Sequence, residues 1–112
     1  MTIIKRKIQG ASVPTAYGNM RVYVEEDEKG QPVDIRANVG KEGTDHYADA
    51  SAITRIASLA VRSGKASISE VYRQLIGIGG DNAIPHGKTM IKSIPDALGK
   101  ALRELYPPEE KK

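Results

Sequence analysis

The stretch that decides the fold is GKTMIKSIPDALGKAL, residues 87–102. Ser93 is a favoured helix N-cap residue, Pro95 fits the first helical turn, and Asp96 completes a capping box with Ser93. Apolar side chains then recur at helical spacing up to the prolines at 107 and 108, which end the pattern. The stretch predicts a loop followed by an amphipathic helix that buries Leu98, Ala101, Leu102 and Leu105.

Two more helices are predicted upstream of this stretch. Residues 47–63 show apolar side chains at positions i, i+3, i+4, i+7 and i+8, which predict a buried stripe of Ile53, Ile56, Ala57, Ala60 and Val61. Gly64 is a natural end for this helix. Ser67 and Glu70 form a capping-box pair that opens the next helix. Its apolar face is Ile68, Val71, Tyr72, Leu75 and Ile76.

The first half of the chain has the two-residue period of strands. Residues 20–26 and 32–39 alternate on either side of a turn at 27–30, with Met20, Val22, Val24, Val33, Ile35 and Ala37 expected to face inward. Residues 2–8 alternate more weakly and predict an N-terminal strand, whereas 11–18, 40–46 and 77–89 are expected to be loops. The fold class is therefore α+β: a small antiparallel sheet, made of the hairpin 20–38 and the N-terminal strand, packed on three helices.

Length and composition set the remaining bounds. The chain has 112 residues, a length sufficient for one modest hydrophobic core. It contains no cysteine, phenylalanine or tryptophan. We expect a single domain over residues 1–106 and a disordered charged tail over 107–112. No apolar run approaches the ~20 residues that a membrane span needs, and a lysine at position 5 comes too early for a signal peptide. The absence of cysteine fits the reducing cytoplasm, so we expect a cytoplasmic protein without a membrane partner.

The residues 87–102 also resemble the terminal motif of the TSCPD domain, a module found at the C-terminus of cobalamin-dependent ribonucleotide reductases. The resemblance continues through residues 18–24 and 30–35, which look like the opening hairpin of that family. It extends over Gly40 to Gly43, the helix of residues 52–64, and residues 71–78. Ile94 stands where the name-giving cysteine belongs, so a thiol or metal role of the family's cysteines is absent here. The resemblance implies a nucleotide-linked ancestry.

The charge distribution is uneven, although the net charge is only +3. Acidic residues dominate positions 25–49, and basic residues dominate positions 51–105. So small a net charge gives no reason to expect long nucleic acids, but a basic helical half suits a small anionic ligand. The alternative is that these charges are simply solvated surface.

Two regions are candidate phosphate sites. The glycine-rich loop and the helix start after it offer backbone N–H groups and the side chains of Asn82, His86, Lys88, Lys92 and Ser93. Asn82 to Thr89 differs from a P-loop by one residue, but a P-loop needs a preceding strand and a larger α/β domain, so we reject that reading. A purely structural glycine loop is the alternative.

The second candidate region is a polar stripe on the helix 47–63, formed by Ser51, Arg55, Ser58 and Arg62. Its two guanidinium groups are suited to bidentate phosphate binding, and the alternative is a solvent-facing stripe. Lys100 and Arg103 on the last helix are further ligand candidates, and Tyr23 is a candidate stacking platform for a base.

No catalytic constellation, cofactor or metal site is predicted. His46 and His86 have no cysteine partners for zinc. We expect a non-catalytic module that binds and sequesters a small phosphorylated, cyclic nucleotide signal. By analogy of size, this resembles phage sponges that counter the Thoeris and CBASS defence systems. The alternative is an accessory, protein-binding module of a ribonucleotide reductase. We also expect a homo-oligomer, because the alanine-rich residues 48–52 allow close approach of a neighbouring chain.

Overall fold

The computed structural model describes residues 2–108 of the chain, which form an α+β fold. The elements in chain order are β1 (Lys7–Thr15), β2 (Gly18–Glu26), β3 (Pro32–Asn38), α1 (Asp45–Arg62), α2 (Ile68–Leu75), β4 (Ile84–His86), β5 (Thr89–Ile91) and α3 (Ile94–Leu105). Strands β1, β2 and β3 form one antiparallel sheet in that order, and β4 pairs with β5 as a separate hairpin. The predicted fold class is thereby confirmed.

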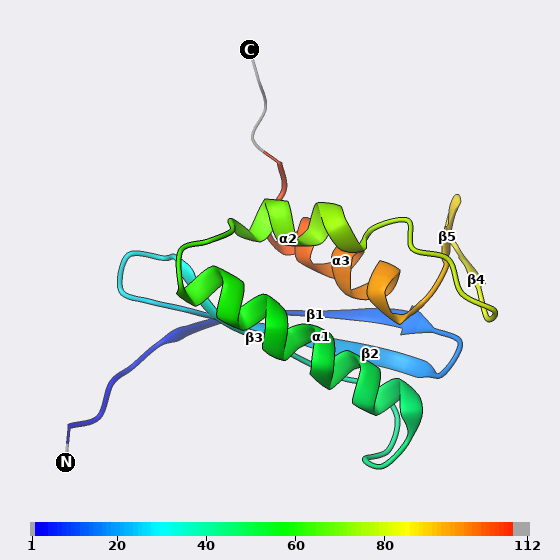
Figure 1. Ribbon diagram of the computed structural model, residues 1–112, viewed down its shortest axis with the longest axis horizontal. Coiled ribbons are helices and arrows are strands. Elements are labelled where there is room, and N and C mark those ends of the chain that lie inside the picture. The colour runs from blue at the N-terminus through cyan, green and yellow to red at the C-terminus, as the bar shows by residue number, and fades with distance from the viewer. Residues whose placement is uncertain (1, 109–112) are drawn as a thin grey trace.

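The helices cover the sheet unequally, as Figure 1 shows. α3 packs against β1 and β2, α2 packs on α3, and α1 runs along β3. The β4–β5 hairpin projects from one end of the molecule. The core lies between the sheet and α3, where Met20, Val22 and Val24 meet Leu98 and Leu102. All five of these side chains are fully buried, as the alternation and the helical spacing predict.

The predicted N-terminal strand is in the wrong place. The prediction covers residues 2–8, of which only residues 7 and 8 belong to β1. The strand continues to Thr15, through most of the segment predicted to be a loop. Pro14 and the small residues 10–12 lower the strand propensity of this segment. β1 is an outer strand, however, and proline is tolerated there. A tight turn then joins it to β2, closed by the Thr15 hydroxyl donating to the Gly18 carbonyl at 2.7 Å.

The glycine-rich segment is less irregular than predicted, because it contains the β4–β5 hairpin. His86 pairs with Thr89 across a two-residue turn, and Gly87 adopts a φ of +60° there, a conformation that favours glycine. The P-loop-like residues are thus part of a hairpin, in agreement with the rejection of a P-loop.

Both capping serines take the predicted positions. Ser67 and Glu70 form a reciprocal capping box at α2. Ser93 accepts a hydrogen bond from the Asp96 amide at 3.1 Å, but the predicted box is only half formed. The Asp96 carboxylate turns away from Ser93 and bonds the Gly77 and Lys92 amides instead.

The predicted buried stripe of α1 is correct only in part: Ala57 is buried and Ile53 and Val61 pack against the core, but Ile56 does not. Ile56 is 70% exposed, and the helix buries Ala50, Thr54, Ala57 and Ser58. The reason is the nature of its neighbour, the outer strand β3. The Ser58 hydroxyl accepts from the Ile35 amide at 2.8 Å and donates to the Ile35 carbonyl at 3.0 Å. Small and polar side chains let the helix approach closely enough for these bonds.

The end of α3 is anchored by two tyrosines. The Tyr72 hydroxyl donates to the Tyr106 carbonyl at 2.9 Å, and the Tyr106 hydroxyl donates to the buried carboxylate of Glu26. Pro107 and Pro108 follow, both exposed. The rest of the predicted tail, residues 109–112, lies outside the described residues. Within the described part of the chain, no helix has the length and apolar character needed to cross a membrane.

Candidate functional site

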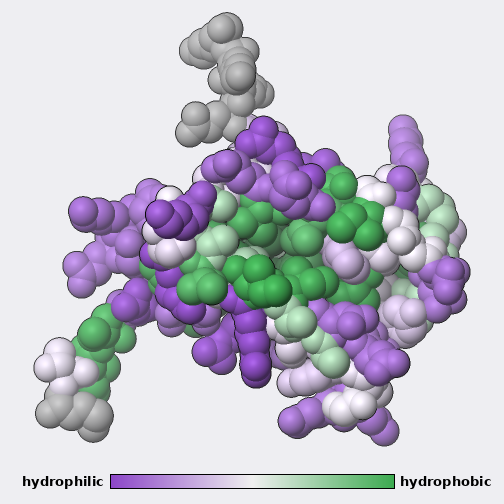
Figure 2. Space-filling model, in the orientation of Figure 1, coloured by the Kyte–Doolittle hydropathy of each residue, from purple (hydrophilic) through white to green (hydrophobic). Residues whose placement is uncertain are grey.

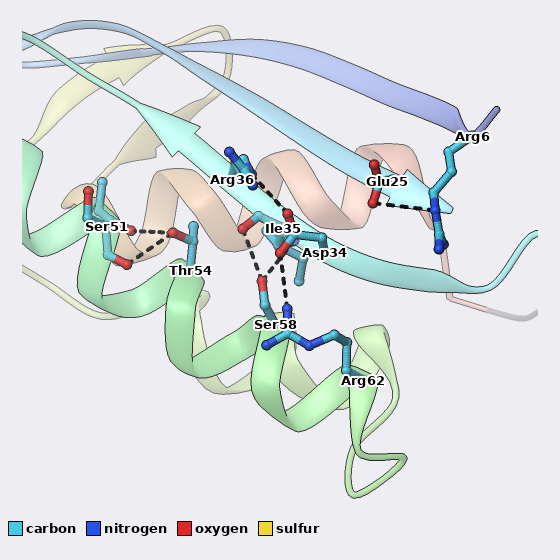
Figure 3. A network of polar contacts seen from close by, with 10 residues as sticks. Arg6, Glu25, Asp34, Ile35, Arg36, Ser51, Thr54, Ser58 and Arg62 are labelled. Atoms are coloured by element: carbon cyan, nitrogen blue, oxygen red, sulfur yellow. Dashed lines mark hydrogen bonds and ion pairs between the residues drawn. The ribbon is translucent and has the colours of Figure 1, made fainter. Parts of the chain in front are cut away.

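A basic hollow of the surface is the groove between α1 and β3, which we call the arginine groove. Its volume is about 350 Å³, at the lower end of the range of small-molecule sites. β3 contributes Asp34, Arg36 and Asn38, and α1 contributes Arg55 and Arg62. Alternation sends these β3 side chains away from the core, which receives Ile35 and Ala37. Figure 3 shows Asp34 and Arg36 of β3 beside Arg62 of α1.

Asp34 holds two of the three guanidinium groups in place. Its carboxylate accepts from Arg36 Nε at 2.9 Å and lies 3.4 Å from Arg62 Nη1. Hydrogen bonding and ion pairing with Asp34 raise the pKa of Arg36 above its usual value. Arg55, also exposed, makes no ion pair among the described residues. Three guanidinium groups and one carboxylate thus line the groove, which gives it a net positive charge that attracts an anion.

The backbone of β3 adds hydrogen-bonding groups to the groove. Ser58 engages both backbone groups of Ile35, so these point away from β2. Successive residues of an antiparallel strand alternate in direction, and Ala37, two residues on, therefore also directs its N–H and C=O toward α1. Ala37 lines the groove, so a bound ligand meets a backbone donor and an acceptor as well as the arginines.

Tyr23 lies next to the arginine groove. It pairs directly with Arg36 across the β2–β3 ladder, so both side chains stand on the same face of the sheet. The ring is 40% exposed, and across β1 it faces the small residue Gly10. The exposed ring thus offers a stacking surface beside guanidinium groups, which bind anions.

The other predicted ligand residues lie in different places. Asn82, Lys92 and Ser93 line a second hollow, between the starts of α1 and α3. Asn82 donates to the Tyr17 hydroxyl at 2.8 Å, and the Tyr17 ring stacks on His46 with centroids 4.5 Å apart. Three carboxylates, those of Asp45, Asp49 and Asp81, also line this hollow, which makes it a poorer phosphate site than the arginine groove.

A third hollow gathers His86, Lys100 and Arg103 between β1, β5 and α3. Lys100 is already engaged there, since its amino group donates to the Asp96 carboxylate and to the Met90 carbonyl. Lys88 lies apart from all three hollows, exposed in the turn between β4 and β5. The predicted residues therefore do not form one site: Arg55 and Arg62 line the same groove, Tyr23 pairs with Arg36 at its side, and the rest are distributed elsewhere.

The start of α3 carries an anion of its own. Asp96 is fully buried and accepts from the amides of Gly77 and Lys92, both at 2.8 Å, and from Lys100 Nζ at 2.9 Å. Burial raises the pKa of Asp96, but these hydrogen bonds and the Lys100 charge outweigh burial and keep it below 3.8. The Gly80 amide bonds the Lys92 carbonyl, and the Ser93 hydroxyl bonds the Ile78 carbonyl. These groups of the predicted phosphate loop thus have partners within the chain.

Sequence reasoning missed Arg36 and Asp34 as members of the site. The available signal was the alternation of the predicted strand 32–39, which puts both side chains opposite Ile35 on the polar face. Their proximity to Arg55 and Arg62 depends on α1 lying along β3, which no local pattern encodes.

The chain matches a known protein family. The family model of the TSCPD domain matches residues 2–106, nearly the whole chain. No curated protein and no solved structure matches it.

Proposed function

We propose that this chain, which belongs to the TSCPD domain family, binds a small phosphorylated nucleotide in the arginine groove and holds it without altering it. The observation that carries the proposal is the convergence of Arg36, Arg55 and Arg62 on one groove that contains a single carboxylate. Guanidinium groups bind phosphate oxygens through paired hydrogen bonds. Tyr23, on the same face, supplies a stacking surface for the base.

Binding without catalysis is supported by the roles of the hydroxyl groups in the groove. The Ser58 hydroxyl donates to the Ile35 carbonyl, and the Thr54 hydroxyl donates to the Ala50 carbonyl at 3.0 Å. These two hydroxyl groups, of the four that line the groove, serve the backbone, and neither is paired with a base that would activate it as a nucleophile. A module of this kind acts by sequestration, as the sponge analogy suggests, and a cyclic dinucleotide or a related signal is the ligand class that we propose.

The direct test is to purify the protein, denature it and identify released small molecules by mass spectrometry. A panel of linear and cyclic nucleotides is then measured by thermal shift and calorimetry. A nucleotide at 100 times its dissociation constant adds about 2.7 kcal/mol of stability. Recovery of the nucleotide unchanged after incubation supports sequestration, whereas its conversion to a product overturns it.

Charge-reversal variants locate the site. Arg55→Glu should weaken binding at least about tenfold, the loss that corresponds to 1.4 kcal/mol. Arg73→Glu makes the same change of net charge on α2, outside the groove, and should leave the affinity within about twofold. Equal effects of both variants, or no binding by any nucleotide of the panel, would refute the proposal.

The reductase hypothesis stays a prediction. It rests on the family alone, whose members accompany cobalamin-dependent ribonucleotide reductases. If the panel gives no ligand, retention of a reductase on the immobilised protein is the result that would favour it.

A further inference from the structure

The outer face of α1 carries the largest exposed apolar side chains of any helix in the described residues. Ile56 is 70% exposed and Leu59 is 61% exposed. Beside them lies an apolar groove of about 480 Å³ between α1 and α2, lined mainly by Ile53, Ile56, Ala57, Ala60, Ala66, Val71 and Leu75. Figure 2 shows this apolar patch in the middle of the face, over α1 and between α1 and α2.

The patch follows from the way α1 is used in the fold. Because the helix turns Ala50, Thr54 and Ser58 toward β3, Ile56 and Leu59 stay outside the core, whereas Ile53 packs partly against it. Exposing two large aliphatic side chains costs about 1.5–3 kcal/mol each relative to burial. Contiguous exposed apolar surface of this kind marks an interaction site. The remaining question is what covers it.

We infer that a second copy of this chain covers it, with the two α1 helices packed antiparallel about a two-fold axis near Ile56. The charges along α1 favour this occupant and this orientation. The first turns carry exposed Asp45 and Asp49, whereas Arg62 and Lys65 are exposed at and beyond the last turn. Antiparallel packing places the acidic end of each helix beside the basic end of the other.

The helical geometry agrees with this pairing. Asp49 lies seven residues before Ile56, and residue 63 lies seven residues after it. Each position is about 10 Å along the helix from the two-fold axis, so residue 49 of one copy lies opposite residue 63 of the other. The Asp49 carboxylate of one copy therefore comes within side-chain reach of Lys65 of the second copy. Ala48 and Ala52 are exposed on the outer face, and such small residues allow the helix axes to approach to about 8 Å.

The alanine-rich stretch thus divides into two roles. Ala50 is fully buried within its own chain, whereas Ala48 and Ala52 are available to the second copy. The Ile56 side chain of each copy meets the apolar groove beside α2 of the other. A two-fold axis perpendicular to the plane of the two α1 helices leaves the same flank of each helix on the same side of that plane. Both arginine grooves therefore open in one direction. The dimer itself does not depend on nucleotide binding.

The test is the mass in solution, measured by sedimentation equilibrium at micromolar protein. Wild type should have twice the 12.1 kDa mass of the chain. Ile56→Glu should be a monomer that retains the circular dichroism of wild type, since this side chain is already exposed within one copy. Ile8→Glu, at a residue 63% exposed on β1, is the matched control and should remain a dimer.

Charge swaps test the orientation. Asp49→Lys and Lys65→Asp should each weaken the dimer severalfold, and the double variant should recover most of the affinity. A monomeric wild type, an assembly larger than a dimer, or a dimeric Ile56→Glu variant would overturn the inference. A double variant that is weaker than both single variants would overturn the antiparallel arrangement.

Discussion

Replacing Asp96 with asparagine should cost a large share of the stability of the fold. The carboxylate is fully buried and accepts three hydrogen bonds, from two backbone amides and from Lys100. Asparagine keeps one oxygen as an acceptor. Its NH2 group replaces the second oxygen and is itself a donor, so it cannot accept a hydrogen bond there. Two of the three hydrogen bonds are therefore lost or replaced by a contact between two donors, and Lys100 loses its counter-charge. Each hydrogen bond to a charged group contributes about 1.5–3 kcal/mol. We expect Asp96→Asn to lower the free energy of unfolding by about 3–5 kcal/mol, the usual cost of breaking a buried ion pair.

Urea denaturation followed by far-ultraviolet circular dichroism measures this loss. A domain of this size has a total stability of about 5–15 kcal/mol, so the variant should unfold at a much lower urea concentration. Asp81→Asn, at an exposed residue of the preceding loop, is the control and should change stability by less than about 0.5 kcal/mol. A loss below about 1 kcal/mol in Asp96→Asn would refute the view that the carboxylate organises the loop and the start of α3.

The same experiment has a signature in pH. The folded-state pKa of Asp96 lies below its usual value of 3.8, so the ionised carboxylate stabilises the fold fully above that value. This stability is lost as the pH falls from 3.8 through the folded-state pKa. Asparagine does not titrate, and the difference between wild type and Asp96→Asn should therefore narrow below about pH 4. If the difference in free energy of unfolding between the two proteins stayed constant down to the pH of acid unfolding, the lowered pKa of Asp96 would be contradicted.

Two further substitutions test other packing features. Ser58→Ala should cost about 2 kcal/mol in urea denaturation, because the buried amide and carbonyl of Ile35 lose their shared partner. Ser63→Ala, whose hydroxyl bond is exposed, should cost under about 0.5 kcal/mol, and equal losses would contradict the reasoning. Gly99→Ala should cost about 1–3 kcal/mol, because a Cβ there would lie 2.8 Å from Ile76 Cγ1 and 3.0 Å from the Ile76 amide nitrogen. A stabilised Gly99→Ala variant would show that helix propensity outweighs this contact.

The features that sequence reasoning predicted correctly are those governed by neighbouring residues. The hairpin of β2 and β3 follows from alternation on either side of a turn, and the start of α2 follows from Ser67 and Glu70 three residues apart. Both signals act within a few residues, so no knowledge of the rest of the chain is needed.

The orientation of α1 could not be predicted in this way. Periodicity identifies an apolar stripe and a polar stripe but does not say which one faces the rest of the molecule. Burial of the apolar stripe is the usual outcome. Here the neighbour of the helix is the outer strand β3, whose backbone groups need hydrogen-bond partners, and Ser58 provides one. The deciding contact joins residues 23 positions apart.

The candidate site was predicted in part for the same reason. The spacing of Arg55 and Arg62 on one helix is a local property, and so is the outward direction of Tyr23. Their assembly with Arg36 requires the packing of α1 on β3. In the glycine-rich loop, composition suggested backbone amides open to a ligand, but it could not show that Asp96 reaches back to accept from Gly77.

The two hydrogen bonds between Ser58 and Ile35 also bear on how this protein avoids aggregation. An outer strand with free N–H and C=O groups is a template onto which another chain can add a strand. Ser58 of α1 provides hydrogen-bond partners for the Ile35 N–H and C=O at the centre of β3, and the helix lies along the strand. α1 thereby prevents strand addition from that side. On the opposite side of the sheet, Pro14 removes a donor from β1, and Lys7 adds a charge that opposes stacking of like chains. Strand addition is thereby opposed at both edges of the three-stranded sheet.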